Sequence, residues 1–154
     1  MTNTQKELIN EWIEDSKILL KYYLSKAQSL RKQNTLIGII SAILSAVVGS
    51  SIFISLGDKP TNNNVAIITG LISLSATILT SVLAFLKLPE IANQCHNSGN
   101  QYAEIRKDLE LLLVSNQNLD IDQELNKIKN KWDDIRSNSI PTSDKIMKKY
   151  KNKL

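Results

Sequence analysis

The chain has 154 residues and a formal net charge of +4, and 42% of its residues are hydrophobic. Its mean hydropathy of -0.15 averages two very apolar runs with two very polar ends, and these ends are too short for a large soluble domain or a conventional enzyme fold. The single cysteine, Cys95, excludes an intramolecular disulfide and suits a reducing compartment.

The first predicted element is an amphipathic cytosolic helix that covers residues 1–35. Apolar residues recur there at helical spacing, at Ile9, Trp12, Leu19, Tyr23, Ala27 and Leu30. Charged residues lie opposite this stripe, and several of them are three or four positions apart. The pattern predicts one helix that continues into the next apolar run and whose stripe needs a partner helix.

Two uncharged runs follow, at residues 36–56 and 65–86, and each is long enough as a helix to cross a hydrocarbon layer roughly 30 Å thick. The segment 57–64 between them is rich in turn formers, which predicts a short extracytoplasmic turn between adjacent antiparallel helices. The chain opens with charged residues instead of a secretory signal, so the first span is expected to remain. Arg31, Lys32 and Lys87 flank the spans and predict that both termini are cytoplasmic, at the cell membrane.

Residues 87–154 are predicted to form further cytosolic helices. One seam of residues spaced by three and four consists of Leu88, Ile91, Cys95, Ser98, Tyr102, Ile105, Leu109 and Leu112, and a second consists of Ile121, Leu125, Ile128, Trp132 and Ile135. Asp120 and Gln123 resemble a capping box that starts the second seam. Residues 141–144 break the pattern before a short last helix with Ile146, Met147 and Tyr150.

The elements together predict an all-α fold, a two-span transmembrane hairpin whose amphipathic cytosolic helices pack as a coiled-coil-like bundle. Spacing leaves open whether the seams close within one chain or between chains. A thin hairpin favours a homo-oligomer. Five basic residues are candidates for contact with anionic lipid, at about 1 kcal/mol for each charge near the surface: Arg31, Lys32, Lys87, Lys148 and Lys149. For the tail, a solvated end is the alternative.

One face of the second span is rich in hydroxyl groups. Within an arc of about 100° it carries the candidate pore-lining residues Thr69, Ser73, Thr77 and Thr80, with Ala76 and Ala84 between them. In a ring of several copies this face would line a narrow, weakly selective pore, because neither span holds an ionisable residue. The alternative is that small and hydroxylated residues only let helices pack closely. The small residues of the first span, Gly38, Ala42, Ala46 and Gly49, with Ser41 and Ser45 beside them, are interpreted as its packing face.

A candidate hinge follows the second span. Pro89 interrupts helical hydrogen bonding toward Phe85, and residues 96–101, which include Asn97 and Gly99, are poor helix formers. This segment either bends between the membrane and the cytosolic helices or is a locally weak turn that is fully packed.

No catalytic, cofactor or metal site is predicted. His96 lies beside Cys95, but the chain has no other histidine or cysteine to complete a metal site, and neither a nucleophile arrangement nor a phosphate-binding glycine loop stands out. The basic tail lacks the interleaved aromatic residues that would argue for nucleic acid.

The order of these elements resembles the SLATT family, the SMODS and SLOG-associating two-transmembrane effector domains. The residues that carry the resemblance are Trp12, Tyr23 and Arg31 before the first span, and Cys95-His96, Tyr102, Ile105 and Arg106 after the second. The resemblance covers nearly the whole chain. It implies a pore-forming effector in a prokaryotic conflict or antiviral system, coupled in trans to a partner that generates or senses nucleotides.

The leading hypothesis is therefore an oligomeric pore former that dissipates ion gradients. The alternatives are a membrane-anchored coiled-coil scaffold, in which residues 121–135 recruit a soluble partner, and a holin-like lysis protein.

Overall fold

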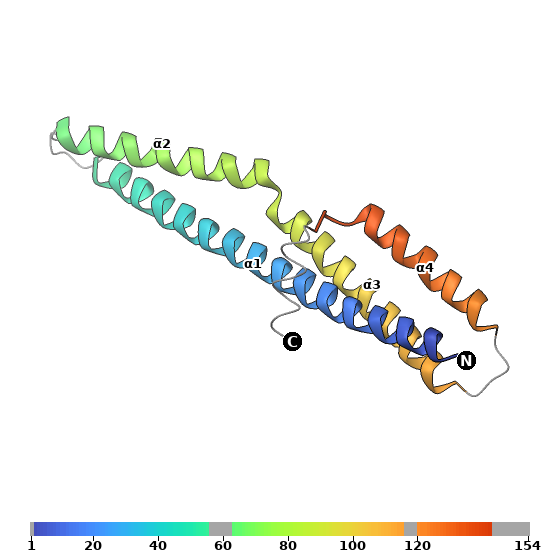
Figure 1. Cartoon of the computed structure of the whole chain (residues 1–154). Coiled ribbons are helices and arrows are strands. Elements are labelled where there is room, and N and C mark those ends of the chain that lie inside the picture. Colours follow the sequence, from blue (N-terminus) through green and yellow to red (C-terminus); the bar gives the residue numbers. More distant parts are fainter. Residues whose placement is uncertain (1, 56–62, 116–119, 143–154) are drawn as a thin grey trace. The chain divides into compact units, whose positions relative to one another are not determined.

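The computed structural model describes residues 2–55, 63–115 and 120–142. They form four helices, α1 (Asn3–Ser55), α2 (Asn63–Leu86), α3 (Leu88–Val114) and α4 (Ile121–Asn138) (Figure 1). All regular structure in these residues is helical, which confirms the all-α prediction. Most of the predicted turn at 57–64, the predicted last helix, and Lys148 and Lys149 lie outside the described residues.

The chain divides into two compact units. Residues 1–28 and 91–154 make up the first, which we call the bundle, and residues 29–90 make up the second, which we call the hairpin. α1 contributes its N-terminal half to the bundle and its C-terminal half to the hairpin. The bundle therefore combines the two ends of the sequence.

The predicted seams close inside the bundle. α1 buries Ile9, Ile13, Ser16, Ile18, Leu19, Tyr22, Tyr23 and Ala27, α3 buries Ala92, Cys95, Ser98, Tyr102, Ile105, Leu109 and Leu112, and α4 buries Leu125, Ile128 and Ile135. The seams are thus satisfied within one chain, the point that residue spacing left open. Burial of these apolar side chains is the main favourable term for folding of this unit.

Aromatic rings form a connected cluster across the three helices of the bundle. Tyr23 on α1 stacks on Tyr102 of α3, with ring centroids 5.7 Å apart. Trp132 on α4 meets Tyr102 edge to face at 5.3 Å and approaches Trp12 of α1 at 6.3 Å. Aromatic pairs at such distances contribute about 1 kcal/mol beyond area burial. The cluster therefore fixes the rotation of α1, α3 and α4 toward one another.

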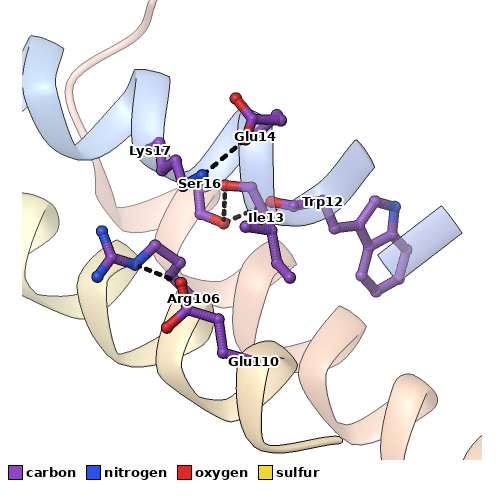
Figure 2. Close-up of polar contacts among 7 residues, drawn as sticks. All are labelled: Trp12, Ile13, Glu14, Ser16, Lys17, Arg106 and Glu110. Atoms are coloured by element: carbon purple, nitrogen blue, oxygen red, sulfur yellow. Dashed lines mark hydrogen bonds and ion pairs between the residues drawn. The ribbon is translucent and has the colours of Figure 1, made fainter. Parts of the chain in front are cut away.

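Polar side chains at the α1–α3 contact pair with groups on their own helix (Figure 2). The buried Ser16 hydroxyl donates to the backbone carbonyls of Trp12 and Ile13, the latter at 3.2 Å. Arg106 Nε on α3 lies 3.2 Å from Glu110 Oε1. This pair is a charge contact without hydrogen-bond alignment, so most of its energy is Coulombic.

Ion pairs link α4 to α3, and a side-chain cap stabilises the first turn of α4. Lys131 lies 3.2 Å from an Asp108 oxygen and 3.4 Å from a Glu104 oxygen, both on α3. The Asp120 carboxylate accepts from the backbone N–H groups of Asp122 and Gln123. The predicted N-cap is thus confirmed, with the side chain occupying donors that no helical carbonyl reaches.

The cap of α4 gives the first testable prediction. Asp120→Ala should lower hydrogen-exchange protection of the α4 amides by about fivefold, because loss of an N-cap costs about 1 kcal/mol. Exchange measured by mass spectrometry on the full chain in detergent checks this. Asp133→Ala, the same change at an exposed interior position of α4, is the matched control, and equal loss in both variants would contradict the cap.

The Tyr102 hydroxyl gives a prediction at alkaline pH. Burial, and secondarily the nearby Tyr23, raises the pKa of Tyr102 from 10.0 to about 12, against the opposing effect of Arg136. Between these values the unfolded chain releases a proton that the folded chain keeps. Stability contributed by the neutral phenol is therefore complete below pH 10 and is lost as pH rises toward 12, at roughly 1.4 kcal/mol per pH unit.

Thermal unfolding of the full chain from pH 9 to pH 12 measures this loss. The melting temperature of Tyr102→Phe should fall less steeply with pH than that of the natural protein. The same slope in both proteins would contradict the assignment.

Candidate functional site

The hairpin exposes its apolar side chains. Segments of α1 and of residues 67–114 are long and apolar enough to cross a membrane, and only 6% of each apolar window is buried inside the chain. The exposed residues include Ile39, Ile43, Ile67, Leu71, Leu74, Ile78 and Phe85. An apolar surface of this extent is stable in contact with lipid and costly in contact with water.

The two spans contact each other through small and hydroxylated residues. Ser41 of α1 and Ala76 of α2 are buried, and the Ser41 and Thr80 hydroxyl oxygens are 2.9 Å apart. Of the small residues predicted on the packing face of α1, Ser41 makes this contact, whereas Ala42 and Ala46 are exposed. The contact follows Ser41, and Ala42 is turned about 100° away from it.

Hydroxyl groups line a groove of about 310 Å³ in the hairpin, formed by Ser45, Val48, Ser73, Ala76, Thr77 and Thr80. Ser45, Thr77 and Thr80 each reach the carbonyl of the residue four positions earlier, at 2.9 Å. Their hydrogens can therefore be used within the helix, while lone pairs on the oxygens remain for further partners. The groove is chemically polar without carrying charge.

The groove brings together three of the four predicted pore-lining residues, Ser73, Thr77 and Thr80. Thr69 is half-buried on the same face but does not line the groove. Thr80 is partly occupied by its contact with α1, whereas Thr77 is exposed at the edge of the α1–α2 contact. Ser45 of α1, which the sequence placed beside the packing face, also lines the groove, a role that sequence reasoning did not assign to it. The repeat of Ser41 and Ser45, four positions apart, is a signal that indicates it.

Basic residues lie near the ends of the spans. Arg31 and Lys32 on α1 are exposed, as is Lys87, which lies 3.6 Å from Glu90. The predicted lipid contacts Lys148 and Lys149 are outside the described residues. The described groove residues hold no ionisable side chain, so any selectivity of this surface depends on size and hydroxyl dipoles.

The helix is interrupted between α2 and α3 at Lys87, whose φ of 45° is left-handed. Pro89 lies in the first turn of α3, where its missing N–H costs no helical bond. Asn97 and Gly99 are helical within α3. Gly99 is buried, and a Cβ there would lie 3.1 Å from Leu24 Cδ2, so α1 and α3 approach closely at this point.

The Cys95–His96 pair shows no metal-site geometry. Cys95 is fully buried, and burial raises the pKa of its thiol, opposed by Lys26. Within the described residues no three His, Cys, Asp or Glu side chains gather in a group that could hold a metal ion.

Comparison with known proteins gives one family. The model of SMODS and SLOG-associating 2TM effector domain family 4 matches residues 21–149. No curated protein and no solved structure matches the chain. The match covers both spans and most of the bundle, which agrees with two membrane-spanning helices and a location in a membrane. The chain therefore belongs to family 4 of the SMODS and SLOG-associating two-transmembrane effector domains.

Proposed function

We propose that this effector acts as an oligomeric pore that dissipates ion gradients in a conflict or antiviral response. The observation that carries the proposal is the uncharged hydroxyl groove of the hairpin. In a single hairpin this groove would face lipid, where the hydroxyl oxygens find no hydrogen-bond donors. In a ring of hairpins the same groove faces a shared axis, where water reaches the hydroxyl oxygens.

Thr77 is the central lining residue in this proposal. It is exposed and lies about 100° from Ala76, the residue of α2 that is buried against α1. Ser73 and Thr80 extend the lining along the same side, with Thr69 one turn further along α2. α1 then supports the ring from outside, and a lining without charge gives weak ion selectivity.

Both ends of the chain lie on the same side of the membrane in this proposal, because the bundle is built from both of them. Arg31, Lys32 and Lys87 are exposed near the ends of the spans. Their positive charges favour the cytoplasmic side of the cell membrane and contact with anionic headgroups, to which Lys148 and Lys149 would add.

The trigger in this proposal comes from a partner that generates or senses nucleotides and acts in trans, in keeping with the association that the family name states. A rearrangement of the bundle would reach α2 through α3. The candidate hinge comprises Pro89, Asn97 and Gly99, next to the helical break at Lys87.

A scaffold that recruits a soluble partner is the second candidate function. Leu111 and Val114 at the end of α3 are 68% and 79% exposed, beside a groove of about 510 Å³ that Leu112 and Ile128 also line. The seam of residues 121–135 is less available for recruitment, because Leu125, Ile128 and Ile135 are buried inside the bundle.

The pore is tested by adding bulk to the groove. Thr77→Leu should abolish most of the potassium leak from liposomes that contain the reconstituted protein, because an isobutyl group replaces a hydroxyl in a narrow lining. Ser75→Leu is the matched control, since it removes an exposed hydroxyl that bonds the Leu71 carbonyl on another side of α2. Equal leak from both variants would argue against this lining, and an oligomer that never leaks would favour the scaffold.

The hinge is tested with Asn97→Ala and Gly99→Ala combined. Alanine at Gly99 raises helix propensity by about 1 kcal/mol and places a Cβ against Leu24, so the stiffened segment should reduce the leak. Asn126→Ala, the same asparagine change at an exposed position of α4, should leave the leak unchanged. A folded double variant with normal leak would show that residues 96–101 are a packed turn.

A further inference from the structure

The bundle contains a cavity that the pore proposal does not use. It has a volume of about 440 Å³, within the range of small-molecule sites. Its walls come from α1, α3, α4 and the segment after α4, and include Tyr23, Tyr102, Trp132, Arg136, Asp15 and Thr142. The cavity is thus built from elements that are distant in sequence and lies wholly within one compact unit.

Tyr102 carries a hydrogen-bonding group that the protein leaves unused. The residue is 2% exposed and lines the cavity, yet within the described part of the chain its hydroxyl meets no hydrogen-bond partner. The neighbouring Tyr23 hydroxyl, by contrast, donates to the Ile140 carbonyl at 2.8 Å and lies 3.1 Å from Thr142 Oγ1. The Tyr102 hydroxyl is not among the fully buried side-chain atoms that lack a hydrogen-bond partner, and it is therefore available to a ligand in the cavity that Tyr102 lines.

Arg136 supplies an available positive charge at the cavity. Its side chain is exposed, and it forms no ion pair with an acidic residue in the described ranges. The Tyr102 phenol is protonated at neutral pH, as every tyrosine with an ordinary or raised pKa is, so it can donate. A guanidinium and a phenol O–H together favour an anionic group such as a phosphate or a carboxylate.

The remaining walls limit what the rest of the ligand can be. Trp132 is half-buried and lines the cavity, and it offers a surface on which a planar ring can stack. Leu19, Ile140 and Pro141 add apolar surface to the walls. The cavity therefore favours a molecule with one anionic end and one planar aromatic end.

We propose that this cavity binds a small aromatic anion, with its anionic group at Arg136 and Tyr102 and its ring against Trp132. Nucleoside monophosphates and aromatic carboxylates share this chemistry. The site belongs to the bundle and is independent of whether the hairpins form a pore.

Tryptophan fluorescence of the full chain in detergent tests the site. The chain has two tryptophans, and a Trp12→Phe background leaves Trp132 as the only reporter. AMP, UMP and phenylpyruvate are titrated separately, with adenosine and inorganic phosphate as the two halves of the ligand. We expect saturable quenching by the mononucleotides or by the aromatic carboxylate, and the more effective of them identifies the source of the ligand.

Three variants assign the contacts. Arg136→Gln should weaken binding about tenfold or more, and Tyr102→Phe, which keeps the ring, about fivefold. Lys129→Gln removes an equal charge from another exposed position of α4 and should leave binding unchanged. Circular dichroism confirms that each variant is folded.

The proposal is overturned by three results. In the first, no probe gives saturable quenching. In the second, Arg136→Gln and Tyr102→Phe bind the probes as well as the unchanged protein does. In the third, inorganic phosphate competes for the site as strongly as AMP does. The last would reveal an anion site without aromatic recognition.

Discussion

The stack of Tyr23 on Tyr102, with Trp132 against its edge, holds the two ends of this chain together. Tyr23 precedes the first span and Tyr102 follows the second, so a local ring contact constrains the path of the whole polypeptide. The contact thus joins a residue before both uncharged runs to a residue after them.

Different interactions stabilise the two units. In the bundle, apolar seams are removed from water, and the favourable free energy of this burial grows with the buried area. In the hairpin, lipid replaces water and the hydrophobic drive between helices disappears, so close packing and hydrogen bonds such as that between Ser41 and Thr80 must suffice. Such bonds contribute only about 0.6 kcal/mol each. The contact between the spans is consequently held by weaker forces than the core of the bundle.

Sequence patterns predicted the spans, the seams and the cap at Asp120, because each depends on local composition and helical period. They did not predict the rotation of the spans, since small residues lie on adjacent faces of α1 and only the partner helix selects Ser41 over Ala42. Pro89 indicated an interruption of the helix in this segment. The helix breaks instead at Lys87, because proline fits the first turn of α3. The cavity beside Tyr102 also escaped prediction, since its walls come from α1, from α3 and from the stretch from α4 to Thr142, which are distant in sequence.

The complete burial of Cys95 has a practical consequence. A thiol reacts as the thiolate, and this thiol is both inaccessible and held protonated by its apolar surroundings. Thiol reagents such as maleimides should therefore not modify Cys95 in the native protein. Cysteines introduced one at a time along α2 would then report their own accessibility to water-soluble labels on the natural background, without first replacing a residue of the bundle core.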